Sequence, residues 1–506
     1  MENPRRERMT MVIEEALQQN SKAKHKSATR VTVIPGDGIG PEIMGSVLTI
    51  LAAARAGIDA EFAEAGEQVY LAGQTSGIPA ETWNSIRETG LVLKGPITTP
   101  QGGGYKSLNV TLRKTLGLYA NVRPCRAYVP YVPAMNPDID VVIVRENEED
   151  LYAGIEHRQT ADVTQCLKLI TRKGCERIVR YAFEYAAQRG RKKVTCMTKD
   201  NIMKLTDGLF HRVFDEIRAE YPNVDSNHQI IDFGMANFVA RPTQYDVIVL
   251  PNLYGDILSD VAAEMTGSVG MGGSANLGPK SAVFEAIHGS APGLARDIAN
   301  PSGLLMAALE MISYIGKVDV TRTIHNAWLK TLEDGIHTAD IFSEMTTQRV
   351  GTMQFTKSVI ERLGDAPVTF GRVQFAGCIR AELEHPVEEK APPDVKKLVG
   401  MDVFLDWTDA GPNELAERLQ VLKTPGFALK MITNRGVKVW PNGHEDTVCT
   451  DHWRCRFQMT DNSGAATGVD LVKILAAVAD AGFECIKTEN LYTFNDVPGF
   501  ALAQGQ

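Results

Sequence analysis

The chain has 506 residues, longer than a single hydrophobic core usually grows, so we expect at least two domains. Hydrophobic residues make up 44% and charged residues 23%, close to an average globular protein, which excludes global disorder. The formal net charge of -9 argues against a nucleic-acid-binding protein, because those proteins carry a basic face or stripe.

The first residues and the cysteines indicate the compartment. Residues 1–28 are polar and carry four glutamates, whereas secretory signals need an apolar core and transit peptides avoid acids, so we expect a flexible extension. The eight cysteines are scattered without a CxxC pair or the spacing of a zinc site, which predicts a reduced, cytoplasmic protein. No apolar stretch approaches the roughly 20 residues of a membrane span, so we expect no membrane partner.

From residue 29 to 364, short β-branched runs alternate with longer helical patterns. RVTVI (30–34), VVIV (141–144) and DVIVL (246–250) are examples of these runs. Such alternation predicts βαβ units, and therefore an α/β core with a mostly parallel sheet and helices on both faces. Two glycine-dense stretches, residues 98–107 and 266–280, are predicted to be loops at the site.

The last part of the chain has a different pattern. Residues 365–396 mix prolines with charges and read as a linker. Residues 397–506 then give the order β-α-β-β-α-β, in which we read residues 427–440 as one strand. That order predicts a small α+β ferredoxin-like domain. Because it carries no catalytic constellation, we expect it to serve assembly or regulation.

Three arginines are the most informative residues of the chain. Arg145 ends the run VVIV, and α/β proteins bind ligands just outside the carboxyl ends of their strands. Arg113 and Arg123 precede it. Guanidinium groups bind carboxylates through bidentate, charge-assisted hydrogen bonds, so three of them fit a small polycarboxylate. Ser107 and Asn109 would add neutral donors. The alternative is that the arginines are ordinary surface residues.

Asp256 and Asp260 are predicted to share one face of a helix that starts directly after DVIVL, because residues four apart lie on the same side. Two carboxylates there would fit Mg2+ or Mn2+. The alternative is one carboxylate favoured by the helix dipole beside a solvated neighbour. Tyr152 and Lys199 are candidates for proton transfer, which at neutral pH requires a cationic, partly desolvated cleft. The alternative is that Tyr152 and Lys199, each considered without the other site residues, have only a structural role.

Two further motifs have a glycine or a proline at a turn. GDGIGPE (36–42) follows the first predicted strand, where backbone amides can approach a ligand, but a tight turn with Pro41 in the first helical turn explains it equally well. HGSAP (288–292), together with Asn300, is predicted to form a rigid loop that accepts an adenine and presents backbone groups to a ribose. A lone His288 would otherwise be structural.

Seven motifs follow the order seen in the metal-dependent β-decarboxylating dehydrogenases and most resemble isocitrate dehydrogenases. They are GDGIGPE, KGPITTPQGGGYKSLNVTLR, YANVRP, VVIVRENEEDLYAGIE, KDNIMKLTDG, NLYGDILSD and FEAIHGSAP. The resemblance covers residues 30–364 and implies a two-lobed isopropylmalate-dehydrogenase-like core. The segments LKMITNRGVKVWP and DHWRCRF are similar to the extra C-terminal domain of the larger homodimeric bacterial members.

The resemblance implies a site shared by two subunits of a homodimer or larger oligomer. Isocitrate would be bound by Ser107, Asn109, Arg113, Arg123, Arg145 and Asn201. Tyr152 would protonate the substrate carbon, and Lys199, lent by the second subunit, would remove the hydroxyl proton. Mg2+ or Mn2+ would be held by Asp256 and Asp260 of one subunit and Asp232 of the other. The coenzyme would contact Lys94, Thr98, Thr99, Glu285, His288, Gly289, Ser290, Ala291, Pro292 and Asn300.

We expect the coenzyme to be NAD, with NADP as the alternative. NADP-dependent members carry Lys-Tyr directly after HGSAP and a Tyr/Arg pair further on, whereas Gly293 and Leu294 follow here and ADIFSEMTTQRVG lacks the pair. Losing cationic partners should weaken binding of the 2'-phosphate. The Asp-Ile of typical NAD-dependent members is also missing, and Arg296 lies near in sequence.

Two other functions fit parts of the pattern. The first is a homoisocitrate or isopropylmalate dehydrogenase, although the isopropylmalate relatives are apolar around the position of Ser107, where SLN fits a third carboxylate. The second belongs to another class, a catalytically silent regulatory subunit. Every named catalytic and metal residue is present, which argues against it.

Overall fold

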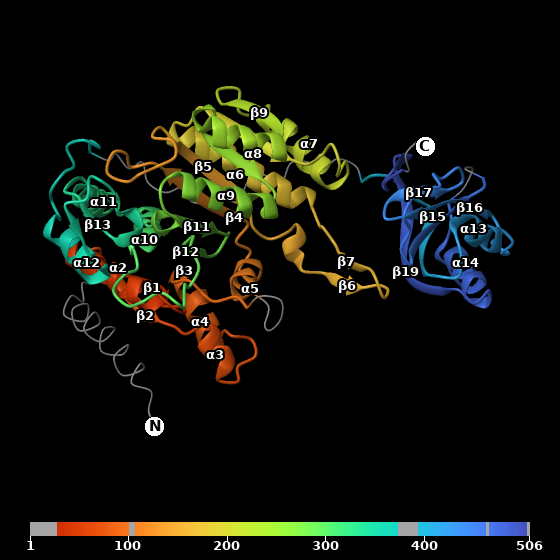
Figure 1. Ribbon diagram of the computed structural model, residues 1–506, viewed down its shortest axis with the longest axis horizontal. Coiled ribbons are helices and arrows are strands. Elements are labelled where there is room, and N and C mark those ends of the chain that lie inside the picture. The colour runs from red at the N-terminus through yellow and green to blue at the C-terminus, as the bar shows by residue number, and fades with distance from the viewer. Residues whose placement is uncertain (1–27, 101–106, 373–392, 462–464, 503–506) are drawn as a thin grey trace. The chain divides into compact units, whose positions relative to one another are not determined.

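The computed structural model describes residues 28–100, 107–372, 393–461 and 465–502 (Figure 1). The predicted N-terminal extension and most of the predicted linker lie outside the described residues. The chain forms two compact units, one made of Met1–Tyr152 with Leu169–Leu383 and the other of Ala153–Lys168 with Glu384–Gln506. Within the described residues, no helix combines the length and the apolar character that crossing a membrane requires.

The first unit is built on a 10-stranded sheet in the order β2-β1-β3-β12-β11-β4-β5-β10-β8-β9. Neighbouring strands are parallel except around β11 and β4, where β12-β11, β11-β4 and β4-β5 are antiparallel. The prediction of a mostly parallel α/β sheet is confirmed. The strands are β1 (Thr29–Ile34), β2 (Ile58–Phe62), β3 (Leu91–Lys94), β4 (Ala120–Arg126), β5 (Asp140–Glu146), β8 (Lys193–Thr198), β9 (Asp225–Ile230), β10 (Val247–Leu250), β11 (Gly273–Leu277) and β12 (Ala282–Ala286).

Helices cover both faces of this sheet, as the apolar runs predict. Val142 and Val144 of β5 pack in a cluster with α6 and α7, whereas Val141 and Ile143 pack in another with α8 and α9 (Figure 1). A strand buried on both faces has no polar alternation, which is why VVIV is continuous. The helices of the unit are α2 (Gly40–Ala53), α3 (Glu67–Leu71), α4 (Ala80–Thr89), α5 (Leu108–Thr115), α6 (Arg172–Arg189), α7 (Thr206–Arg218), α8 (Ile231–Ala240), α9 (Asn252–Met265), α10 (Ser302–Tyr314), α11 (Val318–Glu333) and α12 (Thr352–Glu361), with the short strands β13 (Ile336–His337) and β14 (Gln348–Arg349).

The prediction that residues 266–280 form a loop is wrong in part, because β11 lies inside them. Its residues are buried between β12 and β4. Gly273 explains the glycine density: a Cβ there would lie 2.5 Å from the backbone nitrogen of Ala307 on α10. Glycine at this position serves close packing of a helix on a strand rather than a loop. The other glycine-dense stretch, 98–107, falls largely outside the described residues.

The second unit contains a six-stranded sheet in the order β17-β16-β18-β15-β19-β20. Its four inner strands, β16-β18-β15-β19, are all antiparallel, and with two helices they confirm the ferredoxin-like α+β prediction. A hairpin of β6 and β7 belongs to the same unit. The elements are β6 (Glu156–Arg158), β7 (Thr164–Cys166), β15 (Lys396–Asp406), α13 (Pro412–Gln420), β16 (Phe427–Asn434), β17 (Val437–Trp440), β18 (His452–Met459), α14 (Gly468–Asp480), β19 (Glu484–Phe494) and β20 (Val497–Pro498).

Residues 427–440 form two strands, so the prediction of a single strand there is wrong. Arg435 and Gly436 both have positive φ, at 48° and 82°, and turn the chain between β16 and β17. A two-residue turn with both φ values positive matches the right-handed twist of a hairpin. The signal in the sequence was the single glycine in NRG, which we read as part of the strand.

Polar contacts attach the β6–β7 hairpin to the C-terminal residues, and the buried carboxylate of Asp451 makes two of them. Asp451 accepts a hydrogen bond from Thr160 Oγ1 at 2.6 Å and another from the backbone nitrogen of Asp162 at 3.2 Å. Lys487 Nζ donates to Gln165 Oε1 at 3.2 Å. Segments nearly 300 residues apart in the sequence are therefore joined by polar contacts that local pattern does not reveal.

We expect Asp402→Asn to destabilise the second unit strongly. Arg456 donates to the two oxygens of Asp402 at 2.7 Å and 2.9 Å, and both side chains are buried. Neutralising Asp402 leaves a buried guanidinium without its counter-ion, which costs about 3–5 kcal/mol. Denaturant unfolding followed by tryptophan fluorescence measures the change, since Trp407 and Trp453 lie in this core.

Asp409→Asn is the matched control, because Asp409 pairs with Arg418 at 3.4 Å on the surface. An exposed pair contributes about 0–1 kcal/mol, so this variant should unfold close to the wild type. Equal losses of stability in the two variants would contradict the assigned role of the buried pair.

Candidate active site

The register of two strands brings two of the predicted arginines together. β4 and β5 are antiparallel, with Asn121 opposite Arg145 and Arg123 opposite Ile143, so Arg123 and Arg145 project from the same face of the sheet. Their exposed fractions are 4% and 0%, which excludes the alternative that they are ordinary surface residues. Arg113 stands in the last turn of α5 and is partly buried.

The helix that follows β10 directs two carboxylates at these guanidinium groups. Asp256 and Asp260 both lie on α9, one turn apart. Arg123 contacts Asp256 Oδ1 at 3.3 Å and Asp260 Oδ1 at 3.4 Å, and Arg145 forms an ion pair with Asp256. The structure therefore places both aspartates on one face, as the spacing of four predicts.

Several polar residues that we did not predict orient the two arginines. Arg123 donates to Asn121 Oδ1 at 2.6 Å and to Ser259 Oγ at 2.5 Å, and Arg145 donates twice to Asn252 Oδ1, at 2.9 Å and 2.7 Å. Buried guanidinium groups need such fixed acceptors. The sequence could have indicated two of these residues. Asn252 is the first residue of the motif NLYGDILSD, and Asn121 lies two residues before Arg123 and therefore on the same face of the strand.

The aspartates respond differently to this environment. Burial alone would raise the pKa of Asp256, but the guanidinium groups of Arg145 and Arg123 outweigh it and hold that pKa below its usual value. For Asp260, burial is the largest influence, and with repulsion from Asp256 it outweighs the attraction of Arg123 and raises the pKa. Asp256 is partly buried and Asp260 is exposed. Two carboxylates that repel each other on one helix face fit a site for a hard divalent cation.

Tyr152 lies against this cluster. Its hydroxyl donates to Asp256, and the guanidinium carbon of Arg145 lies 4.9 Å from the centre of its ring. Contrary to our expectation of a cleft that favours loss of its proton, burial raises the pKa of Tyr152 and outweighs the attraction of Arg145. A tyrosine that stays protonated at neutral pH is in the form that a general acid requires.

Lys199 and Asp232 form a second polar group. Lys199 follows β8, Asp232 stands in the first turn of α8, and Lys199 Nζ lies 2.7 Å from Asp232 Oδ1. The hydrogen bond from Lys199 lowers the pKa of Asp232. Among the described residues, the side chains of Lys199 and Asp232 make no hydrogen bond or ion pair with Asp256, Asp260 or Tyr152. Asn201, two residues on, is exposed.

The loop containing HGSAP packs on the GDGIGPE turn. The backbone nitrogen of Ile39 donates to the carbonyl oxygen of Ser290 at 2.9 Å, and Ser290 Oγ lies 2.8 Å from Thr98 Oγ1. Asp37 accepts from the backbone nitrogen of Thr98 at 2.9 Å. Three segments far apart in sequence are thus joined, and two of them, Thr98 and the HGSAP loop, were predicted to contact the coenzyme. The glycine-rich turn supports the HGSAP loop.

The structure places the remaining predicted coenzyme residues in different environments. Glu285 is buried and pairs with Lys94 at 2.6 Å and Arg113 at 3.0 Å. Burial alone would raise the pKa of Glu285, but these two cations outweigh it and hold that pKa far below its usual value. Lys94 and Glu285 therefore position Arg113. Thr99 donates to Ser107, His288 contacts the Gly289 carbonyl oxygen, and the buried Asn300 donates to Asp340. Gly289, Ala291 and Pro292 are exposed. Asn109, which we predicted to bind substrate, lies in the first turn of α5.

Comparison with protein-family models decides the family. The chain matches the family described as isocitrate/isopropylmalate dehydrogenase over residues 30–359. It belongs to the isocitrate/isopropylmalate dehydrogenase family. Residues 396–506 match a second model, described as the bacterial isocitrate dehydrogenase C-terminal domain.

Relatives and solved structures agree with this assignment over nearly the whole chain. Isocitrate dehydrogenases named for NADP from Rickettsia felis and Thermus thermophilus are 50% and 45% identical, cover 94% of this chain and are themselves covered to 99% and 96%. The crystal structure of the TT0538 protein from Thermus thermophilus superposes with a TM-score of 0.89 at 44% identity, covering 94% of this chain and 96% of that one. The recognition from seven motifs is confirmed.

In this dehydrogenase fold, we expect Gly38→Ala to displace the loop that contains HGSAP, which we predict to contact the coenzyme. Gly38 has a φ of +58°, and a Cβ there would lie 1.9 Å from the carbonyl oxygen of Ser290. The strained backbone and the clash together should cost about 1–3 kcal/mol or displace the loop. The KM for the coenzyme should rise several-fold while the KM for the acid substrate changes little, as steady-state kinetics would show.

Gly73→Ala is the control for backbone strain alone. Gly73 also has a positive φ, +101°, but nothing lies within 4 Å of a Cβ built there. An equal rise in the coenzyme KM for both variants would show that the contact with Ser290 has no special role.

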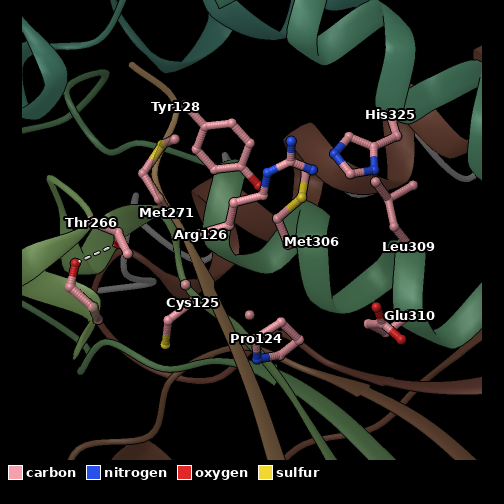
Figure 2. Close-up of a pocket in the computed structure, with 13 residues that line it drawn as sticks. Pro124, Cys125, Arg126, Tyr128, Thr266, Met271, Met306, Leu309, Glu310 and His325 are labelled. Atoms are coloured by element: carbon pink, nitrogen blue, oxygen red, sulfur yellow. Dashed lines mark hydrogen bonds between the residues drawn. The ribbon is translucent and has the colours of Figure 1, made fainter. Parts of the chain in front are cut away.

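A hollow of about 100 Å³ lies elsewhere in the first unit. Cys125, Arg126, Met271, Met306, Glu310 and His325 are among the residues that line it, and none of the predicted site residues does (Figure 2). His325 and Leu309 come from neighbouring helices on one side of it, and Pro124 and Cys125 from β4 on the other (Figure 2). The end of β4 beyond Arg123 therefore borders a different space from the arginine cluster.

Proposed function

We propose that this chain is an isocitrate dehydrogenase that oxidises isocitrate with a nicotinamide coenzyme and releases CO2, giving 2-oxoglutarate. The observation that carries the proposal is the pair of buried arginines, Arg123 and Arg145, held against two carboxylates and a tyrosine. Buried cations of this kind are candidates for a site that binds an anionic ligand. Relatives at 45% to 50% identity carry the same name.

The arginines would bind the carboxylates of the substrate. Arg145 and Arg123 have fixed orientations, so little side-chain entropy is lost when they form bidentate hydrogen bonds. Arg113 would provide a third guanidinium group for the substrate. Ser107, the N-cap of α5, and Asn109 in its first turn stand at the start of that helix, where they fit the carboxylate that distinguishes isocitrate from a branched alkyl substrate. We also propose that Asn201 binds the substrate.

The donor set fits a divalent cation. Asp256 and Asp260 offer hard oxygen ligands on one helix face, and Asp232 of a second subunit would add a third. Mg2+ or Mn2+ held there supplies Lewis-acid stabilisation of negative charge that develops on the substrate oxygens. Removal of divalent ions with a chelator should abolish turnover, and Mn2+ should restore it.

Two residues would move protons. Lys199 would accept the proton of the substrate hydroxyl as hydride leaves the neighbouring carbon for the nicotinamide. After CO2 has departed with its bonding electrons left on the substrate, Tyr152 would give its proton to the carbon that carried the lost carboxylate. Its raised pKa keeps the proton available at neutral pH.

A homodimer is part of the proposal, and three exposed apolar side chains support it. Ile202, Phe233 and Ile257 are exposed by 69%, 64% and 48%. Ile202 lies three residues after Lys199, and Phe233 and Ile257 directly follow Asp232 and Asp256. A second copy of the chain would cover them and complete the site.

We propose NAD as the coenzyme, because no Lys-Tyr follows HGSAP. The specific observation in favour of NADP is that the relatives above are named for it. Isocitrate oxidation measured side by side with the two coenzymes decides between them: kcat/KM should be higher with NAD, and a higher value with NADP would reverse the assignment.

The same assay with homoisocitrate and 3-isopropylmalate tests the substrate. A homomeric protein with no isocitrate turnover would favour the regulatory subunit.

For residues 397–506 the proposal is a role in assembly or regulation, and truncation that leaves the oligomeric state and kinetics unchanged would refute it. A cytoplasmic location belongs to the proposal as well. The cysteines within the described ranges are free thiols, as a reducing compartment favours.

A further inference from the structure

A group of metal-ligating side chains lies outside the proposed active site. Asp200 follows β8, His211 stands in α7, and His228 lies on β9, the strand at the edge of the large sheet. One ligand atom from each of the three lies within 4.8 Å of the others. We propose that Asp200, His211 and His228 form a binding site for a transition-metal divalent cation of the Zn2+ type.

The contacts of the three residues support this site. His211 Nδ1 lies 2.6 Å from Asp200 Oδ2, and His228 Nε2 lies 3.9 Å from Asp200 Oδ1. The two imidazole rings stack, with centres 3.5 Å apart and planes at 16°. An ion would replace the hydrogen bond between Asp200 and His211, and each ring would tilt toward it. Thr198 Oγ1, 2.8 Å from His228 Nε2, and Asp215 Oδ2, 3.6 Å from His211 Nε2, are the nearest further groups.

The electrostatics favour the neutral form of the His228 imidazole, which is the form that binds metals. Burial, followed by repulsion from His211, lowers the pKa of His228, so this ring carries a lone pair at neutral pH. Asp200 supplies one negative charge, and its pKa is held below the usual value because the hydrogen bond and charge of the histidines outweigh its burial. Two histidines and one carboxylate prefer Zn2+, Co2+ or Ni2+ over Mg2+. The site therefore differs in metal preference from the all-carboxylate set of Asp256 and Asp260.

The alternative interpretation is that the three residues are purely structural and form a hydrogen-bond network that fixes the turn after β8. Asp200 holds α7 through His211, and the backbone nitrogen of Lys199 donates to Asp207 Oδ2 at 2.7 Å. A network of this kind needs one histidine opposite the carboxylate. The second histidine stacks on the first, and its Nε2 is hydrogen-bonded to Thr198 Oγ1 at 2.8 Å while lying 3.9 Å from the same carboxylate. It therefore adds a nitrogen ligand that the link between Asp200 and α7 does not require.

Occupancy would also affect the neighbouring residues of the chain. Asp200 lies directly between Lys199 and Asn201, so an ion that draws Asp200 toward the two histidines would shift the position of Lys199. This consequence, unlike the binding itself, rests on the proposed function. We infer that Zn2+ at this site lowers turnover of isocitrate.

Titration calorimetry with Zn2+, on the full chain in saturating Mg2+, tests the binding. The wild type should bind one Zn2+ per chain, and His211→Gln and His228→Gln should each weaken binding by about tenfold or more. His444→Gln is the control, because His444 is exposed and lies elsewhere. Thermal unfolding without Zn2+ shows that each variant is folded, and if one variant fails to fold, the other carries the test. Absence of Zn2+ binding to the wild type, or undiminished binding by a folded variant, overturns the proposal.

Inhibition by Zn2+ tests the consequence separately. Zn2+ that displaces Mg2+ from Asp256 and Asp260 would inhibit the wild type and His211→Gln equally, whereas Zn2+ at the proposed site inhibits only the wild type. A band of Co2+ absorption in the visible range, lost in His211→Gln but present in His444→Gln, would show that bound Co2+ depends on His211 even if turnover were absent. Equal spectra for all three proteins would count against the site.

Discussion

Replacing Arg145 with lysine is expected to lower kcat/KM for isocitrate by about 10²- to 10⁴-fold. Arg145 is fully buried, donates from two nitrogens to Asn252 and forms an ion pair with Asp256. A single ammonium group cannot satisfy these partners and a substrate carboxylate together. Loss of one partner from a buried charged network costs about 3–5 kcal/mol, and each 1.36 kcal/mol is a factor of ten in rate.

Steady-state kinetics of the variant at saturating Mn2+ and coenzyme would measure this loss. Arg172→Lys is the control, since Arg172 pairs with Glu216 on the surface of the same unit. That variant should keep its kcat/KM within a factor of about two, as expected for an exposed pair. Thermal unfolding of both proteins separates lost binding from lost folding. A folded Arg145→Lys enzyme with nearly wild-type kcat/KM would exclude Arg145 from the substrate site.

Much of the site follows from local rules that the sequence displays. Because α9 begins two residues after β10, the spacing of Asp256 and Asp260 was enough to put both carboxylates on one face near the carboxyl edge of the sheet. The run VVIV likewise fixed where Arg145 emerges. These features depend on helix and strand periodicity, which acts over a few residues and is readable from them.

Other features depend on pairings between distant segments, and for these the local pattern carries no signal. That Arg123 and Arg145 share a face depends on the register of β4 with β5, and the burial of Lys94 and Glu285 depends on β3 lying beside β12. Gly273 was misread for the same reason, since only the approach of α10 explains it. The raised pKa of Tyr152 depends on how deeply its hydroxyl is buried, which no spacing reports.

The polar residues of the proposed site form two separate sets within one chain, and this separation bears on how the chain assembles. Arg123, Arg145, Tyr152 and Asp256 contact one another, whereas Lys199 contacts Asp232. A carboxylate–ammonium pair at a partly exposed position contributes little to stability, so stability alone does not account for this pair, which leaves room for the proposed role of Lys199 and Asp232 in a partner's site. A single chain would then hold two incomplete halves rather than one complete site.

Mixing two inactive variants is therefore expected to restore activity. Lys199→Met and Asp256→Asn should each be nearly inactive as homodimers, because every site in the first lacks the proton acceptor and every site in the second lacks a metal ligand. In a mixed dimer, one site combines Asp256 of the first chain with Lys199 of the second and is intact. Random pairing makes about half of the dimers mixed with one intact site each, so the unfractionated mixture should recover about a quarter of the wild-type activity and purified mixed dimers about half.

The measurement is turnover of co-expressed chains carrying two different affinity tags, purified through both so that only mixed dimers remain. Co-expression of Asp256→Asn with Arg145→Lys is the control, since both residues belong to the same half and no intact site can form. Activity in the first mixture and none in the second would establish that Lys199 crosses to the partner. If neither mixture gained activity although mixed dimers were isolated, the site would lie within one chain, and the pairing of Lys199 with Asp232 would be structural.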